Sequence, residues 1–374
     1  MVSTGRASRG ALLRLGGWLF MNEPIRFYLG GYAKKGENGL LRCAFADGRF
    51  SVECANNELE NPSWLLPHPA KPLIYAVEEL SPQGRLAVLE DRGGSIVRLA
   101  SVSTEGADPC HIAADPDFRH LFVSNYSGGS LAVYALDEAG LPARMTDFRQ
   151  HHLPAVPQAG GNPARQEGPH VHFSLCDGEQ VYVNDLGRNQ VIVYDWDGKN
   201  GCLTGIRDVI GFPAGAGPRH LTFDAEGRHL YVICELDLMI HVFLRQEDGT
   251  WRREQVVSAV PGERLSESLA ARSTAAAIHF ADEHTLCAST RGFDLLAVFR
   301  VDDYGLLTDR QIFASGGRMP RDFLPAGDML FAANQGSGCV QAFRRAGASF
   351  APVGAPLPAC SPTCLCALPR FREP

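Results

Sequence analysis

The stretch GAGPRHLTFDAEGRHLYVICEL, residues Gly215–Leu236, decides the fold of this chain. It predicts a β-hairpin, because two apolar and β-rich runs flank the polar turn Asp224–Arg228. The two strands run antiparallel around that turn. Arg219, just ahead of the first strand, and Glu235, just after the second, are therefore expected at the same end of the sheet. One hairpin would thus present an arginine and a carboxylate side by side.

The same hairpin pattern occurs six times along the chain, at spacings of 47, 60, 49, 58 and 44 residues. The six segments are Pro62–Glu79, Pro109–Tyr126, Pro169–Leu186, Pro218–Leu236, Ala276–Gly292 and Pro320–Gly336. Most are followed by further strand-like runs, among them Leu131–Leu136, Val191–Trp196, Ile240–Leu244 and Leu296–Val301. Repeats of this length with four strands each are typical of β-propeller blades.

A seventh blade is divided between the two ends of the chain. Ser361–Pro369 resembles another leading strand, and its missing partners are the runs Ile25–Gly30, Leu40–Ala44 and Phe50–Cys54. Pairing the C-terminal strand with the N-terminal ones would close the ring and leave no open sheet edge. We therefore predict an all-β, seven-bladed propeller with four antiparallel strands per blade, forming a single domain over residues 23–374. Frequent Gly and Pro exclude a helical alternative.

Composition limits the functions that the chain can have. A net charge of −7 without any cluster of Lys and Arg argues against binding to nucleic acid or to an anionic membrane. The 11 cysteines are scattered, and several lie inside apolar runs, as Cys43, Cys234 and Cys287 do. This pattern indicates a reduced, cytoplasmic protein without a disulfide framework. We expect a monomer or a weak homo-oligomer.

Two segments invite other interpretations. Cys360, Cys364 and Cys366 could bind a metal, but no Cys or His pair lies near them in the sequence, so we interpret them as small residues of a last strand. Residues 1–22 are expected to be a disordered extension, or to precede a natural start at Met21. Arg14 interrupts the apolar run that a signal peptide would need.

Polar residues gather where the leading strands begin and where their partners end. Because the leading strand of a propeller blade is innermost, these residues should surround one mouth of the central channel. They are His111, His170, Arg219, Arg321, Glu78, Glu79, Asn125, Asp185, Glu235, Arg291, Asn334 and Gln335. Arginines that face one another repel unless carboxylates or a bound anion compensate. The pattern therefore predicts a pocket for an anionic ligand. The Pro- and Gly-rich insertion His151–Gly168 is expected to cover it.

Several blocks of the sequence resemble the seven-bladed lactonase family, which includes propeller-type 6-phosphogluconolactonases and fungal 3-carboxy-muconate lactonising enzymes. The blocks are Gly161–His172, Gly215–Leu236, Ser289–Asp294 and Met319–Phe323, with Asn61–Ser63 and Ala333–Gln335, and the resemblance covers about residues 23 to 369. It implies catalytic roles for His170, Arg219, Glu235 and Arg291. It also implies a ligand shell that includes Arg321, to which we add His172, Asn125, Asp185 and Gln335. Cys234 and Thr290 stand where the family usually has Asn.

Hydrolysis of a lactone fits these residue types. It needs an activated water, donors for the oxyanion and a proton for the leaving alkoxide. Glu235 or His170 could move the protons, and the sequence does not decide between them; Arg219 and Arg291 could bind the oxyanion or a substrate carboxylate. His170 and His172 lie two residues apart and could bind a metal, but the many arginines disfavour a divalent cation. We expect no metal and no cofactor.

The expected substrate is a small anionic lactone, with 6-phospho-D-glucono-1,5-lactone of the pentose phosphate pathway as the best candidate. A lactone of an aldaric or uronic acid is an alternative, as is a cyclase that forms a lactone from an unsaturated dicarboxylate. A propeller without catalytic activity, used as an interaction platform, would be expected to expose apolar or aromatic residues at the mouth. This mouth is charged instead.

Overall fold

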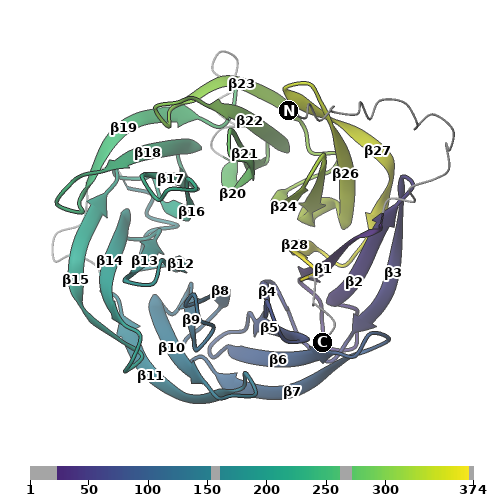
Figure 1. Ribbon diagram of the computed structural model, residues 1–374, viewed down its shortest axis with the longest axis horizontal. Helices are drawn as coiled ribbons and strands as arrows, with labels where there is room; N and C mark the ends of the chain where they lie inside the picture. The colour runs from purple at the N-terminus through teal and green to yellow at the C-terminus, as the bar shows by residue number, and fades with distance from the viewer. Residues whose placement is uncertain (1–22, 153–160, 262–271, 370–374) are drawn as a thin grey trace, which may run out of the picture.

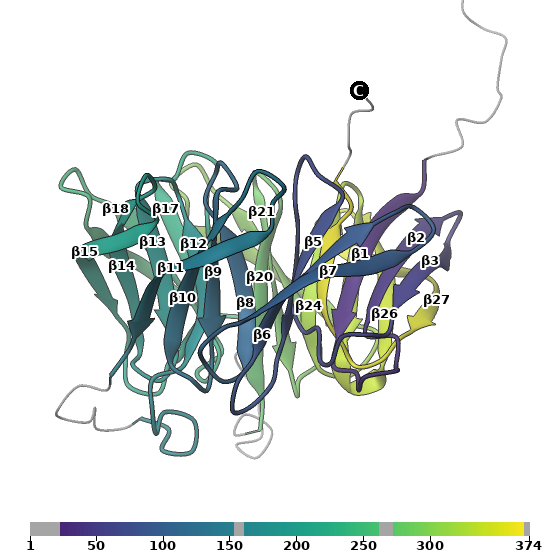
Figure 2. The same ribbon diagram turned by 90° about the horizontal axis from the view of Figure 1, so that it is seen from below.

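The computed structural model describes residues 23–152, 161–261 and 272–369. These residues form seven four-stranded antiparallel sheets, arranged as blades around a central axis (Figure 1). Seen from the side, the blades stand next to one another and their innermost strands run along the axis (Figure 2). The predicted seven-bladed β-propeller is confirmed. The expected extension over residues 1–22 lies outside the described residues.

The blades are numbered here in chain order, and the strands of each are given from the axis outward. Blades 1 to 3 consist of β28 (Pro362–Ala367), β1 (Ile25–Gly31), β2 (Leu40–Ala46) and β3 (Arg49–Asn56); β4 (Leu65–Pro67), β5 (Leu73–Glu78), β6 (Arg85–Asp91) and β7 (Ile96–Ser103); β8 (Pro109–Ala114), β9 (His120–Asn125), β10 (Ser130–Leu136) and β11 (Pro142–Gln150).

The remaining four blades follow the same order. Blades 4 to 7 consist of β12 (Val171–Cys176), β13 (Gln180–Asp185), β14 (Gln190–Asp197) and β15 (Cys202–Gly211); β16 (Pro218–Phe223), β17 (His229–Cys234), β18 (Met239–Arg245) and β19 (Trp251–Ser258); β20 (Thr274–Asp282), β21 (Thr285–Arg291), β22 (Leu295–Val301) and β23 (Leu307–Ala314); β24 (Pro320–Ala326), β25 (Met329–Asn334), β26 (Cys339–Ala346) and β27 (Ser349–Pro358). A short 3-10 turn, η1 (Gln335–Ser337), follows β25.

Blade 1 closes the ring as the sequence predicts. Its innermost strand, β28, comes from the C-terminal end of the chain and pairs antiparallel with β1, with Leu365 opposite Leu29. Cys364 and Cys366 lie in β28, which confirms their interpretation as strand residues, whereas Cys360 precedes the strand and is exposed, so for Cys360 the interpretation was wrong. All 11 cysteines are free thiols, so the expected lack of a disulfide framework is also confirmed.

The hydrophobic core lies between neighbouring blades. Blades 1 and 7, for example, share a buried cluster in which the rings of Phe27 and Phe331 stack with centroids 5.2 Å apart. Each central strand is buried on both faces, which explains why its sequence is an unbroken apolar run rather than an alternating one. No helix within the described residues has the length and apolarity needed to cross a membrane.

A β-bulge near the start of the innermost strands determines which side chains point to the axis. In blades 3, 4, 5 and 7 the pairing skips the strand's second residue: Cys110, His172, Arg219 and Arg321 respectively. In blades 3, 5 and 7 the residue before the strand is left-handed, as Gly217 is with φ of +66°. Bulges bend a strand and redirect a side chain. Here they direct the skipped residue toward the molecular axis.

Candidate active site on the propeller axis

Two kinds of position meet at one end of the axis: the bulged residue of the innermost strand, where a blade has one, and the residue at or directly after the end of the second strand. The N–H of the latter donates to the carbonyl two residues before the bulge. Glu235 donates to Gly217 over 2.7 Å, for example, and Tyr126 to Asp108 over 2.9 Å. The residues that follow the second strands in this way are Tyr32, Glu79, Tyr126, Leu186, Glu235 and Gln335, and Arg291 ends β21 at the matching register. We call these seven residues, with the bulged residues, the axial ring.

Glu235 is the centre of the axial ring. It is buried, and its two carboxylate oxygens accept from three arginines. Oε2 lies 2.9 Å from Nε of Arg219 and 2.8 Å from Nη2 of Arg291, while Oε1 lies 2.5 Å from Nη2 of Arg165. The predicted neighbourhood of Arg219 and Glu235 is therefore confirmed, and the hairpin brings them together directly.

Backbone carbonyls of blade 6 hold two of these arginines in place. Nη1 of Arg219 donates to the carbonyl of Ala276 over 2.7 Å and to Nε2 of His220 over 3.0 Å. Nη2 of Arg291 donates to the carbonyl of Ala275 over 2.9 Å. These carbonyls lie at the start of β20, where its pairing with β21 shifts register between Ala275 and Ile278. Both guanidinium groups are consequently fixed before any ligand binds.

Arg165 reaches the site from the insertion that the sequence analysis expected to cover it. Of that insertion, residues 151, 152 and 161–168 are described. Besides Glu235, Arg165 contacts the hydroxyl of Tyr126 over 3.0 Å. The sequence analysis did not single out Arg165. The sequence offers little to indicate a role for Arg165, except that it is the one arginine of a Pro- and Gly-rich loop.

The opposite side of the axial ring holds a second carboxylate, Glu79. The hydroxyl of Tyr32 donates to Oε1 of Glu79 over 2.7 Å, and the hydroxyl of Ser63 donates to Oε2. The guanidinium of Arg321 lies 5.3 Å from the centre of the Tyr32 ring, as in a cation–π contact. Among the described residues, Arg321 makes no ion pair. It is therefore the arginine of the ring with the most freedom to bind a ligand.

The two predicted histidines differ in their contacts. The ring of His170 stacks on Tyr126 with centroids 4.4 Å apart, and both of its nitrogens face oxygens, of the Tyr126 carbonyl and of Glu167, each at 3.1 Å. His172 occupies a bulged position, and its Nδ1 is buried without a hydrogen-bond partner in the described residues. His172, unlike His170, thus has a ring nitrogen that makes no hydrogen bond to the described residues and can bind a ligand.

Electrostatics hold this site in a defined charge state. Burial opposes ionisation of Glu235, but Arg291, Arg219 and Arg165 outweigh it and keep the pKa of this carboxyl well below its usual range. Burial, with repulsion from Arg291, lowers the pKa of Arg219 to about 9, so the guanidinium stays charged at neutral pH. Burial and the nearby Arg219 hold the pKa of His172 well below its usual value. At neutral pH the site therefore contains a carboxylate, charged arginines and a neutral imidazole.

The structure does not place every predicted residue on the axis. Asn125 ends β9 and is fully buried, and its amide donates to the carbonyl of Thr104 and the hydroxyl of Ser130. Asp185 ends β13, where it accepts from the N–H of His170 and lies 2.7 Å from Nδ1 of His151. These side chains stabilise their own blades. Successive side chains of a strand point in opposite directions, so these two lie one position away from the residues of the axial ring, and their role as ligand residues stays a prediction.

Three further residues of the predicted mouth also lie away from the axial ring. His111 is buried between the rings of Trp64 and Phe173, Glu78 pairs with Arg98, and the amide of Asn334 donates to the carbonyl of Ser315. Gln335, one residue after Asn334, does belong to the ring, and its Oε1 is buried without a partner in the described residues. In six blades the ring position is thus the one directly after the second strand, whereas in blade 6 Arg291 is the last residue of β21.

A surface cavity of about 370 Å³ lies at the other end of the inner strands. It is lined by Asp177, Glu179, Phe223, Asp224, Ala225, Gly227 and Arg245. Asp224 follows β16 directly, whereas Arg219 lies at the start of that strand. Three carboxylates against one arginine make this cavity unfavourable for an anion.

Comparisons with known proteins agree with this geometry. The model of the family described as "Lactonase, 7-bladed beta-propeller" matches residues 26–366. An uncharacterised protein of Staphylococcus saprophyticus is 31% identical over 331 residues, which cover 85% of this chain and 91% of that protein. A 6-phosphogluconolactonase of Bacillus subtilis is 29% identical over 335 residues, covering 85% and 90%.

Two solved structures have the same fold at similar identity. A putative 6-phosphogluconolactonase of Bacteroides uniformis superposes with a TM-score of 0.81 at 28% identity, covering 92% of this chain and 99% of the other. The periplasmic gluconolactonase of Pseudomonas aeruginosa also gives 0.81, at 26% identity, with coverage of 93% and 100%.

Proposed function

The chain belongs to the seven-bladed β-propeller lactonase family, and we propose on this premise that it hydrolyses the lactone of an acidic sugar, with 6-phospho-D-glucono-1,5-lactone as the first candidate substrate. The product would then be 6-phosphogluconate. The name of the Bacillus subtilis relative supports this choice of substrate. The name of the Pseudomonas aeruginosa protein supports the second candidate, the gluconolactone without a phosphate.

The excess of positive charge in the axial site carries the proposal. Arg165, Arg219, Arg291 and Arg321 face only two carboxylates of the axial ring, Glu79 and Glu235, so four cations and two anions leave a charge of about +2. A phosphate monoester at neutral pH carries nearly the opposite charge. Arg321 has no ion pair in the described residues and is the group that we assign to the substrate's anionic end. Planar guanidinium groups also bind such oxygens through two parallel hydrogen bonds.

We assign the developing oxyanion to Arg219 and Arg291. Attack of a water oxygen on the lactone carbonyl moves an electron pair onto the carbonyl oxygen, and a fixed donor stabilises that charge in the transition state. Both arginines are held by blade 6, so little reorganisation is needed during the reaction. When the tetrahedral intermediate collapses, the ring C–O bond breaks and the alkoxide takes a proton.

His172 is our candidate for the proton transfers. Three arginines occupy the oxygens of Glu235, so we assign it no proton transfer. His170 already directs both nitrogens at protein oxygens. His172 is neutral and has a nitrogen without a partner in the described residues. It would accept a proton from the attacking water and return it to the leaving alkoxide, while Glu235 positions the arginines.

A panel of lactones tests the substrate. Purified protein is assayed with 6-phosphogluconolactone, gluconolactone and the lactones of glucaric and glucuronic acid, each with and without a chelator. We expect hydrolysis of the phosphorylated lactone with the highest kcat/KM, unchanged by the chelator. Arg321→Lys should raise KM for the phosphorylated lactone more than for gluconolactone. Equal rates on both lactones would instead favour the gluconolactonase alternative, and loss of activity in chelator would contradict the arginine-centred mechanism.

A pair of histidine variants tests the mechanism. His172→Asn should lower kcat by about two to four orders of magnitude, which is the usual contribution of general acid–base catalysis. His170→Asn is the matched control, because it removes the imidazole of the residue two positions before His172. We expect its effect on kcat to be much smaller. The reverse order of effects would assign the proton transfers to His170.

A further inference from the structure

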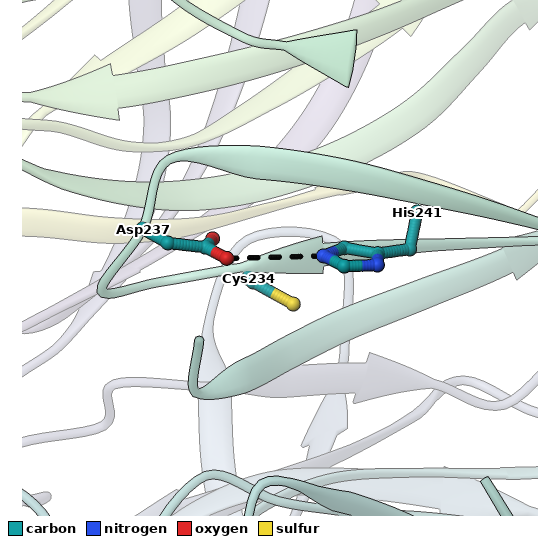
Figure 3. A group of neighbouring side chains, drawn as sticks. All are labelled: Cys234, Asp237 and His241. Atoms are coloured by element: carbon teal, nitrogen blue, oxygen red, sulfur yellow. Dashed lines mark ion pairs between the residues drawn. The ribbon is translucent and has the colours of Figure 1, made fainter. Parts of the chain in front are cut away.

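The turn between β17 and β18 brings together three side chains that can bind a transition metal. They are Cys234, the last residue of β17, Asp237 in the turn, and His241 in β18. Figure 3 shows the carboxylate of Asp237 pointing across the turn to the His241 ring, with the thiol of Cys234 beside them. One ligand atom from each residue lies within 4.8 Å of the other two.

The fold of the hairpin places these residues on one face. His241 pairs with Val232 in the sheet, and Cys234 lies two residues after Val232, so both point to the same side. Oδ1 of Asp237 accepts from the N–H of Met239 over 3.0 Å and fixes the turn. Its other oxygen, Oδ2, is thereby directed to Nε2 of His241 at 3.8 Å, which is too long for a hydrogen bond.

His241 supplies an independent indication that this cluster can bind a ligand. Its side chain is only 2% exposed, yet neither ring nitrogen has a hydrogen-bond partner in the described residues. The ring of Phe212 lies 5.0 Å away in an edge-on contact, and Cys234 belongs to the same apolar cluster as Phe212 and Phe243. Buried imidazoles without a partner are rare, because burial removes the water that would otherwise bind them.

In two other blades an asparagine occupies the position equivalent to Cys234. Asn125 in blade 3 and Asn334 in blade 7 end their second strands as Cys234 does, and each donates its amide to a backbone carbonyl. A thiol cannot donate comparably. Blade 5 therefore lacks this side-chain hydrogen bond and has a thiol, a carboxylate and an imidazole in its place.

From this geometry we propose that Cys234, Asp237 and His241 bind one Zn²⁺ ion. Thiolate and imidazole ligands select zinc over magnesium or calcium, and a third ligand from a carboxylate is common. Binding forms a bond between zinc and the Cys234 sulfur and releases the thiol proton to solvent. Zinc then carries two charges against one each on Cys234 and Asp237, so the bound cluster is neutral and suits an apolar surrounding.

The required rearrangement is small. Ligand atoms around tetrahedral zinc are about 3.3–3.8 Å apart, since each lies at about 2.0–2.3 Å from the metal. The separation of 3.8 Å between Asp237 and His241 is already at the upper end of this range, and the separations from Cys234, at most 4.8 Å, need to contract by about 1 Å. The side chain of Asp237 is 29% exposed, so water can reach the fourth position from that side.

The metal would stabilise the turn that begins with Glu235. Cys234 and Glu235 are successive residues, so their side chains point in opposite directions, one to this cluster and one to the axial ring. The proposed zinc therefore takes no part in the lactone chemistry, and the expectation of a metal-free reaction is unaffected. It would affect the melting temperature of the protein instead.

The test uses untagged, full-length protein that has been treated with a chelator and then titrated with Zn²⁺. We expect one tightly bound Zn²⁺ per chain and a higher melting temperature when it is bound. With Co²⁺ in place of Zn²⁺, a sulfur-to-cobalt charge-transfer band should appear in the near ultraviolet. The proposal is overturned if the wild-type protein binds no Zn²⁺ at about 10 µM free metal, a concentration far above the dissociation constants of structural zinc sites.

Variants locate the site. Cys234→Ala should abolish the cobalt band, and Asp237→Asn should weaken zinc binding at least about tenfold while preserving the turn, because an asparagine oxygen can still accept from Met239. Cys287→Ala, which removes a buried cysteine of blade 6, is the matched control and should bind as the wild type does. Unchanged binding in Asp237→Asn, or loss of binding in His172→Asn, would place the metal elsewhere and refute the proposal.

Discussion

At the scale of single residues, the arrangement around Glu235 explains why this carboxylate cannot be replaced without cost. Three guanidinium groups converge on it in a buried site. Breaking such a cluster by removing one partner leaves uncompensated buried charge. The ion pair between Arg219 and Glu235 therefore serves the stability of the site as well as its chemistry.

Glu235→Gln should accordingly lower both stability and activity. We expect a loss of about 3–5 kcal/mol in the free energy of unfolding, because three arginines lose their counter-charge. We expect kcat to fall about 10²- to 10³-fold as the oxyanion donors lose their fixed positions. Chemical denaturation and steady-state kinetics on the same preparation measure the two effects.

Glu79→Gln is the control for that variant. Glu79 accepts from the hydroxyl groups of Tyr32 and Ser63, and in the described residues it forms no ion pair, so neutralising it breaks no direct contact with an arginine. Its loss of stability should be clearly smaller. Equal losses in the two variants would mean that the arginine cluster contributes no particular stability.

Three buried histidines should make the stability depend on pH. Burial, together with the charge of Arg219, holds the pKa of His111, His172 and His220 well below the usual value. In the unfolded chain they take up protons near pH 6.5, whereas in the folded chain they do so only at lower pH. Their contribution is therefore complete above about pH 7 and falls by about 1.4 kcal/mol per pH unit for each histidine as the pH drops below 6.5.

Urea unfolding between pH 5.5 and 7.5 measures this dependence. His111→Gln removes one of the three titrating groups without adding charge. The slope of the unfolding free energy against pH should therefore decrease by the contribution of about one proton, which is about 1.4 kcal/mol per pH unit. An unchanged slope in this variant would show that His111 is not held neutral in the folded protein.

At the scale of the elements, the residue before each innermost strand is the critical one. Gly217 has φ of +66°, and its carbonyl accepts the N–H of Glu235. A Cβ at this position would lie 2.8 Å from Cγ of Leu236. Gly217→Ala should therefore destabilise the protein by about 1–3 kcal/mol and displace Glu235, which would lower kcat as well.

Gly227 provides a matched control, because it has the same φ of +66° in the turn between β16 and β17, but a Cβ added there would meet no atom of the described residues within 4 Å. Gly227→Ala should cost only the backbone strain, about 1 kcal/mol, and leave kcat unchanged. If both variants behave alike, the contact with Leu236 and the link to Glu235 have no effect.

At the scale of the whole molecule, ring closure depends on a single strand. Deleting residues 358–374 removes β28, which exposes the edge of β1 and the apolar cluster that contains Phe27 and Leu29. Exposed strand edges promote aggregation. The truncated protein should aggregate or melt far below the intact one, as seen by thermal unfolding with light scattering.

Deletion of residues 370–374 alone is the control for this truncation, since β28 ends at Ala367 and stays intact. Its melting temperature should match that of the full chain. A stable truncation at residue 358 would mean that blade 1 does not need its innermost strand.

Much of the architecture could be predicted because it follows from local pattern. Apolar runs, turn residues and spacing located the hairpin of β16 and β17 and the divided blade of β28 and β1 without any tertiary information. The proximity of Arg219 and Glu235 followed from the antiparallel pairing of one hairpin. Arg165 could not be found in this way, because a loop residue that lies 70 positions before Glu235 has no periodic pattern to place it.

The sequence by itself therefore determined the number of blades, the closure of the ring and the one contact that a single hairpin makes, since each depends on strand periodicity. Only the tertiary structure decided which polar residues face the axis. A bulge at the start of the inner strands redirects the side chains of His172, Arg219 and Arg321, and in six blades the position after the second strand completes the ring. The side chains of a strand alternate, so a shift of one residue separates Glu235 on the axis from Cys234 on the opposite face.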